Sequence, residues 1–162
     1  MTGPSVIVRV GELQVVSAPA TLIAVALGSC IAVVMHDPGA GVGGLAHVLL
    51  PVPSMSRLRD QPGRFAQTAV PTLLERLIAR GARSPRITAR LIGGASMFTT
   101  LTLPGSMQMG ERNVVAAREA LHRHGVRLTA EAVGGDFGRT ASFDVTTGAV
   151  IISSYLRGDL VL

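Results

Sequence analysis

The feature that most constrains the fold is a long uncharged stretch that spans residues 13–35. Its length alone would allow a transmembrane helix, because about 20 apolar residues can cross a bilayer. Pro19 and the pair Gly28-Ser29 interrupt the stretch, however, and the pieces between them are rich in β-branched residues. Short apolar pieces of this kind are typical of buried β-strands. The sequence therefore predicts strands at 22–27 and 31–35, joined by a tight turn, and no transmembrane segment.

Most of the remaining chain also has the pattern of strands. Apolar alternation and turn signals predict further strands at 6–10, 13–16, 42–50, 87–92, 126–132, 141–145 and 149–156. Two segments, 65–80 and 111–124, have the helical period or helical end charges instead. Pro71 lies inside the first and predicts a kink or a later helix start. Strands clustered towards both ends of the chain predict an α+β layered sandwich rather than a βαβα series.

Composition limits the classes of function. The chain is 48% hydrophobic and 15% charged, which predicts one well-packed domain over residues 1–162. Aromatic residues are only 3%, so a base-stacking surface for nucleic acid is not expected. Four histidines and one cysteine show no paired ligand spacing, so we expect no metal and no cofactor. The net charge of +5 comes from scattered arginines, which suit either a solvated face or an acidic partner.

The cellular setting follows from two observations. The first residues lack a basic segment followed by an apolar one, so no signal peptide is predicted. The chain has one thiol and cannot form an internal disulfide. Both observations favour a reducing, cytoplasmic setting.

Cys30, the one cysteine, directly follows Gly28 and Ser29. Glycine permits a sharp turn, and backbone N–H groups at such a turn can stabilise an oxyanion. If 31–36 and 42–48 pair as a hairpin, Cys30 and His47 lie at the same end of the sheet. A thiolate and an imidazolium placed in this way can carry out nucleophilic catalysis. A lone cysteine in an apolar segment can also be a small buried hydrophobe, and the spacing alone leaves both interpretations open.

Several short motifs occur in a characteristic order along nearly the whole chain. They are Leu27-Gly28-Ser29-Cys30, Asp37-Pro38, Gly43 to Pro51, Gly93 to Phe98, Gly110 to Val114, Gly134-Gly135, Gly138-Arg139, Phe143-Asp144 and Thr147-Gly148. Together they resemble the signature of the CheD chemoreceptor glutamine deamidases. Each motif is short and unspecific by itself, and the ordered set carries the resemblance.

The resemblance implies a three-layer α/β sandwich, with mixed or antiparallel sheets and two main helices. It also implies hydrolysis of glutamine side-chain amides in methyl-accepting chemotaxis receptors, with release of ammonia. The family's nucleophile falls on Cys30 and its base on His47. Its third member is a threonine six residues before the cysteine, where this chain has Ala24. A backbone carbonyl could orient His47 instead, because fixing the imidazole tautomer needs only an acceptor.

Other residues are weaker candidates. Gly28, Ser29 and Ser96 are expected to shape the substrate slot, although Ser96 also suits a plain strand-end turn. Arg112 and Asn113 match a family motif and are expected to brace the fold. Two alternatives stay open: a CheD-like binding module that engages receptors or a CheC-type phosphatase, with Ala24 marking reduced catalysis, or a thiol hydrolase that acts on another amide.

Overall fold

The computed structural model describes residues 3–97 and 107–162, so Phe98 of the fourth motif lies outside the described residues. Two five-stranded mixed sheets form two of its layers. The first sheet contains, in spatial order, β1 (Ser5–Ile7), β3 (Thr21–Leu27), β8 (Arg139–Asp144), β9 (Val150–Ser154) and β10 (Gly158–Val161). The second contains β2 (Leu13–Ser17), β5 (Val42–Val48), β4 (Ile31–Asp37), β6 (Thr88–Gly93) and β7 (Arg127–Val133).

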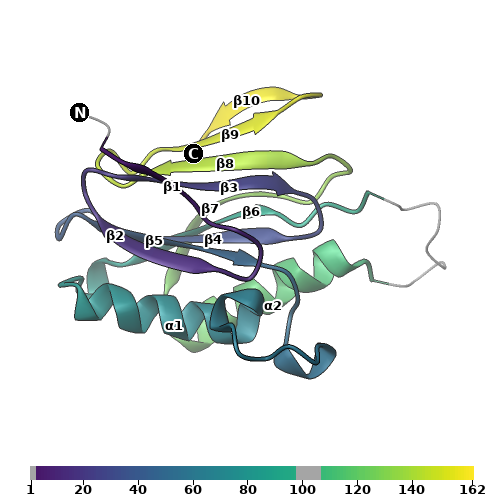
Figure 1. The fold of residues 1–162 in the computed structure, drawn as a ribbon, viewed down its shortest axis with the longest axis horizontal. Helices are drawn as coiled ribbons and strands as arrows, with labels where there is room; N and C mark the ends of the chain where they lie inside the picture. Colours follow the sequence, from purple (N-terminus) through teal and green to yellow (C-terminus); the bar gives the residue numbers. More distant parts are fainter. Residues whose placement is uncertain (1–2, 98–106) are drawn as a thin grey trace.

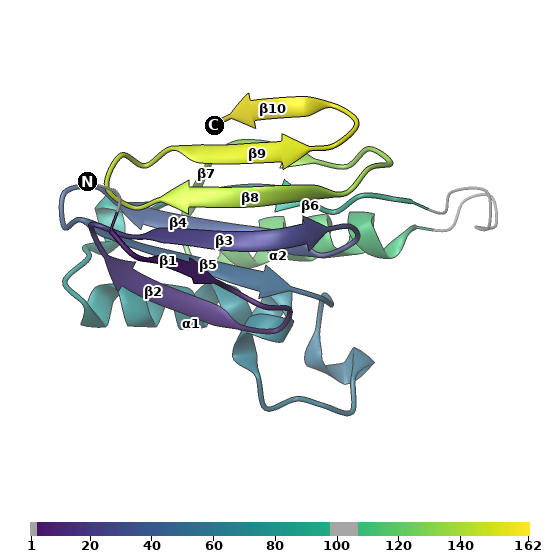
Figure 2. The same ribbon diagram turned by 45° about the horizontal axis from the view of Figure 1, so that its top comes forward.

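Two helices form the third layer. α1 (Ala66–Ala79) and α2 (Met109–Arg123) cover the face of the second sheet that points away from the first sheet (Figures 1 and 2). Three short 3₁₀ turns lie around α1, namely η1 (Pro53–Met55), η2 (Pro62–Arg64) and η3 (Ser84–Arg86). The arrangement confirms the predicted α+β three-layer sandwich with two main helices.

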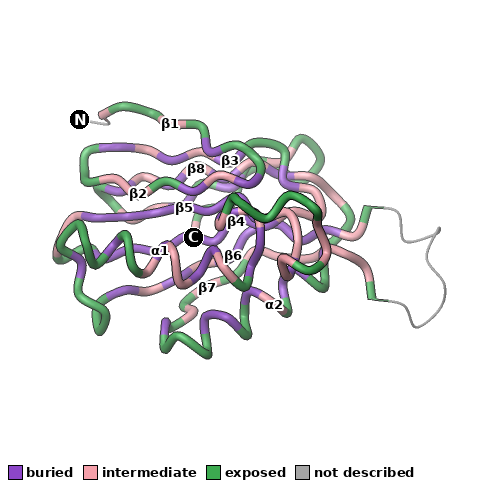
Figure 3. The backbone as a smooth tube through the Cα atoms, turned by 60° about the horizontal axis from the view of Figure 1, so that its bottom comes forward, coloured by how far each residue is buried: buried purple, intermediate pink, exposed green. Residues whose placement is uncertain are grey.

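The molecule has two hydrophobic cores, one between the sheets and one between the second sheet and the helices. β4 and β5 contribute to both, since alternate side chains on a strand point to opposite faces. Every residue of these two strands is buried, as Figure 3 shows along the tube. Burial on both faces explains why the sequence of β4 has a continuous apolar run instead of an alternating pattern.

One expectation, about Pro71, needs correction. Pro71 neither delays nor interrupts α1, which begins at Ala66 and continues to Ala79. The proline removes one helical bond, to the carbonyl of Gln67, and Gln67 is exposed, so water can satisfy that carbonyl. The segment before α1 contains the two 3₁₀ turns η1 and η2, because Pro53 and Pro62 each start a short helical turn.

The strand predictions are largely confirmed, and the structure adds three features. β3 and β4 lie in different sheets, so the turn at residues 28–30 carries the chain across the sandwich. β10, which the pattern did not predict, adds an edge strand to the first sheet. β6 and β7 are parallel and are joined through α2, so the fold contains one βαβ unit. In the described ranges, no helix is long and apolar enough to cross a membrane.

Candidate active site

The hairpin formed by β4 and β5 brings Cys30 and His47 to one end of the second sheet. Ala32 lies opposite His47 and Ile31 opposite Val48, as the sequence predicted. Cys30 lies two residues before Ala32, so it is a diagonal neighbour of His47 on the same face. That face points towards the first sheet, because Ala32 is part of the core between the two sheets and Cys30 packs against that core. The chain enters this end from β3, whose arrowhead points to it in Figure 1.

His47 is oriented by a backbone group. Its Nδ1 lies 3.0 Å from the carbonyl oxygen of Val8. A carbonyl can only accept, so Nδ1 carries the proton and Nε2 is left as the basic nitrogen. Nε2 is buried and has no hydrogen-bond partner among the described residues. Burial lowers the pKa of His47, with the Val8 carbonyl acting in the opposite sense, so the resting imidazole is neutral.

The segment between β1 and β2 fixes this carbonyl in place. The N–H of Val8 donates to the carbonyl of Ile23 at 2.8 Å. The N–H of Gly11 donates to the His47 carbonyl at 2.8 Å, and the backbone N–H of His47 donates to the backbone carbonyl of Glu12 at 3.0 Å. His47 is therefore held through its own backbone and its ring by one short segment. No side-chain signal in the sequence marks Val8, because only its backbone takes part.

Cys30 is partly exposed and packs against the edge of the core between the sheets. Burial raises the pKa of the Cys30 thiol, and a hydrogen bond from its own backbone N–H opposes the rise. A raised thiol pKa does not favour the resting thiolate–imidazolium pair that the sequence suggested. Both pKa directions favour a neutral thiol and a neutral imidazole over an ion pair.

The turn before Cys30 is tied to the neighbouring β6 and α2. The carbonyl of Gly28 accepts from the N–H of Ala95 at 2.8 Å, and the carbonyl of Cys30 accepts from Gly94 at 2.9 Å. The carbonyl of Ser29 accepts from Asn113 Nδ2 at 2.9 Å. All three carbonyls of the turn thus have partners. In residues 3–97 and 107–162, no hydrogen bond to another residue engages the N–H of Ser29 or Cys30.

Ala24 has no hydroxyl to offer as a third member of the site. It lies on β3, is fully buried between the sheets and faces Ala141 on β8. The register of β3 shifts directly after it, and Ala26 has a φ of 57°, in the left-handed region. This bulge interrupts the pairing of β3 with β8, which resumes at Leu27 opposite Arg139, just before the Cys30 turn.

Ser96 is the candidate with the least structural support. Its N–H donates to the carbonyl of Gly135 at 2.9 Å, which fits a strand-end turn. A pocket of about 320 Å³ opens beside the Cys30 turn. It is lined by Ser29, Ala95, Met97, Gln108, Met109 and Gly110, and Ser96 is not among these residues.

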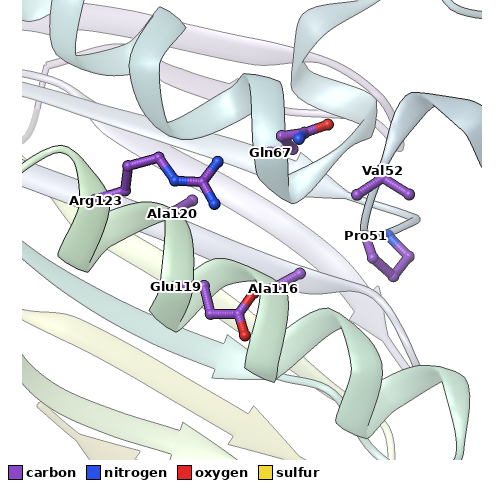
Figure 4. Close-up of a pocket in the computed structure, with 7 residues that line it drawn as sticks. All are labelled: Pro51, Val52, Gln67, Ala116, Glu119, Ala120 and Arg123. Carbon is purple, nitrogen blue, oxygen red and sulfur yellow. The ribbon is translucent and has the colours of Figure 1, made fainter.

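A second, smaller pocket of about 50 Å³ lies on the helical side (Figure 4). Its walls come from α1, α2 and the segment after β5, and neither Cys30 nor His47 contributes. Within the described ranges, no group of three or more His, Cys, Asp or Glu side chains could hold a metal ion.

Comparison with known proteins identifies the family. The model of the CheD family, described as CheD chemotactic sensory transduction, matches residues 49–154. A probable chemoreceptor glutamine deamidase CheD from Methanococcus maripaludis is 39% identical over 145 residues, 90% of this chain and 92% of that protein. The chemoreceptor glutamine deamidase CheD of Thermotoga maritima is 40% identical over 153 residues, 94% of each chain.

One solved structure supports the fold alone. A Neisseria meningitidis protein of the family DUF152 superposes with a TM-score of 0.50 at 13% sequence identity. The superposition covers 83% of this chain and 65% of the Neisseria chain. The family match covers more than half of the chain, and the relatives align over about nine tenths of it. The chain belongs to the CheD family.

Proposed function

We propose that this chain is a protein-glutamine deamidase of chemotaxis receptors, with Cys30 as nucleophile and His47 as general base and acid. The observation that carries the proposal is the free, basic Nε2 of His47 on the same face and at the same end of the sheet as Cys30. The names of the relatives, chemoreceptor glutamine deamidases, give the substrate class. We further propose that residues 1–162 form one catalytic domain, which works in the cytoplasm without a cofactor.

The first half of the reaction forms a thioester. The Cys30 thiol transfers its proton to His47 Nε2 while the sulfur attacks the side-chain carbonyl carbon of the substrate glutamine. The carbonyl π electrons move to oxygen, and the N–H groups of Ser29 and Cys30 stabilise the oxyanion. When the tetrahedral intermediate collapses, the carbon–nitrogen bond breaks and the His47 imidazolium protonates the leaving amide nitrogen. Ammonia leaves and the acyl group remains on Cys30.

The second half releases glutamate. His47 Nε2 removes a proton from water, and the resulting hydroxide attacks the thioester carbon. Collapse of this second intermediate breaks the carbon–sulfur bond, and the proton returns to the Cys30 sulfur. Gly28 gives the turn room for the substrate chain to approach the backbone.

Mass spectrometry of receptor cytoplasmic fragments tests the proposal. Conversion of an amide to an acid adds about one dalton per site, so wild-type protein should produce that gain and Cys30→Ala should not. A gain that survives Cys30→Ala would overturn the mechanism. If wild-type protein binds the receptor or a CheC-type phosphatase without any mass gain, the chain is a binding module, as the missing threonine hydroxyl at Ala24 would allow.

A further inference from the structure

Asn113 on α2 contacts both segments that carry the proposed catalytic pair. It is fully buried, and its Nδ2 donates to the carbonyl of Ser29 at 2.9 Å and to that of Leu49 at 3.0 Å. Ser29 directly precedes Cys30, and Leu49 is two residues beyond His47. One amide group therefore links the turn before β4 to the end of β5.

From this arrangement we infer that Asn113 is a positioning residue, which aims the backbone N–H of Cys30 at the substrate oxyanion. The inference rests on the proposed function. The carbonyl of Ser29 and the N–H of Cys30 belong to one peptide plane, and the only cis peptide in the described part of the chain is Ala18-Pro19. In a trans peptide these two groups point in opposite directions. By holding the Ser29 carbonyl towards α2, Asn113 turns the Cys30 N–H towards the reaction side.

The neighbouring peptide plane is held in the same way. The N–H of Ala95 binds the Gly28 carbonyl at 2.8 Å, so the N–H of Ser29 is turned away from β6. α2 packs tightly on this region, since a Cβ at Gly110 would lie within 2.6 Å of the Gly94 carbonyl oxygen. The two proposed oxyanion donors are thus fixed before substrate arrives, which is the condition for electrostatic stabilisation of the transition state.

The remaining atom of the Asn113 amide supports a role beyond packing. Its Oδ1 is buried without a hydrogen-bond partner in the described part of the chain. An unpaired buried acceptor destabilises a fold, and an apolar residue of similar size at this position would not carry that cost. Local departures from good packing and pairing are characteristic of functional sites.

Three measurements on wild type, Asn113→Ala and Asn113→Leu test the inference. The first is kcat for deamidation, which should fall by about 10- to 100-fold in both variants, as when an oxyanion donor is lost. The second is the rate of Cys30 alkylation by iodoacetamide, which forms no oxyanion and should stay within about twofold. The third is the protection that butyraldehyde gives Cys30 against alkylation by iodoacetamide. The thiol adds across the aldehyde carbonyl and forms a hemithioacetal. This protection should weaken by about tenfold.

Leu121→Ala is the matched control, since Leu121 is buried on the same helix and belongs to the core on the helical side. It should lower stability without changing the ratio of kcat to alkylation rate. Equal falls of kcat and alkylation in the Asn113 variants, or unchanged aldehyde protection, would overturn the inference. If wild-type protein fails to deamidate receptors, the proposed function fails, and the aldehyde measurement still decides the role of Asn113. Asn113→Leu keeps the number and branching of the side-chain heavy atoms and serves if Asn113→Ala does not fold.

Discussion

The Nδ1 atom of His47 lies 3.0 Å from the backbone carbonyl oxygen of Val8, which is an acceptor that can orient the ring without a side-chain hydroxyl. The carbonyl fixes the Nδ1–H tautomer and leaves Nε2 unprotonated. Because the acceptor is part of the backbone, the identity of residue 24 is not needed to orient the ring. Four predictions follow from this contact and from the surrounding geometry.

Ala24→Thr should give no large gain in deamidation rate. The Nδ1 atom of His47 already has an acceptor, the Val8 carbonyl. Ala24 is fully buried, so two extra heavy atoms should overpack the core and lower the free energy of unfolding by about 1–3 kcal/mol. We expect the rate to stay within about threefold of wild type, measured by mass gain of receptor fragments alongside urea unfolding. A rate increase above about tenfold would show that the carbonyl orients His47 poorly.

Alkylation of Cys30 should be slow at neutral pH and should rise steeply in alkaline solution. Burial raises the pKa of the thiol above its ordinary range, and only the thiolate reacts with iodoacetamide. The measurement is the alkylation rate from pH 6 to pH 10, about the range in which thiols titrate. The urea-unfolded chain is the control and should titrate at lower pH. A plateau already reached below pH 7 in the folded protein would instead indicate a preformed thiolate–imidazolium pair.

Asp37 should stabilise the fold in a pH-dependent manner. The Arg86 side chain, with backbone N–H groups including that of Arg83, lowers the pKa of Asp37 to about 2. Its pKa in the unfolded chain is higher, about 3.9, so the contribution is complete above that value and is lost as the pH falls towards 2. At pH 7, Asp37→Asn should reduce the free energy of unfolding by about 1–3 kcal/mol.

That difference between wild type and Asp37→Asn should shrink as the pH falls from 4 to about 2. Urea unfolding at several pH values provides the measurement. Asp60→Asn is the control, because Asp60 is exposed in the loop before α1 and should give little difference at any pH. An Asp37→Asn effect that is constant across this range would mean that the carboxylate charge is unimportant.

Ala26→Gly should stabilise the protein. Ala26 has a φ of 57°, a left-handed conformation that costs a residue with a Cβ about 1–2 kcal/mol. Glycine removes this strain, but its greater freedom in the unfolded chain offsets part of the gain in stability. We expect a net gain of up to about 1 kcal/mol in thermal or urea unfolding. Ala116→Gly in α2 is the contrasting control and should destabilise by about 1 kcal/mol. Equal destabilisation by both changes would show that the backbone at Ala26 is not strained.

Local patterns were sufficient for much of the fold and for the proposed catalytic pair. The turn Asp37 to Gly41 joins two apolar segments of equal length, which predicts the β4–β5 hairpin and with it the common end of Cys30 and His47. The apolar period of α1 likewise predicts a helix over nearly its observed range. These features depend on side chains that are close in sequence, so the sequence by itself determined them.

Only the tertiary structure decided how the pair is oriented. The Val8 carbonyl reaches His47 across 39 positions, and Asn113 reaches Ser29 across 84. Backbone carbonyls are present at every residue, so no amino-acid type marks the one that is used. The sequence also did not show that β3 and β4 belong to different sheets, because both strands have the same apolar pattern. Side-chain periodicity specifies the elements, whereas long-range hydrogen bonds to backbone carbonyls, which every residue type carries, set the geometry of the site.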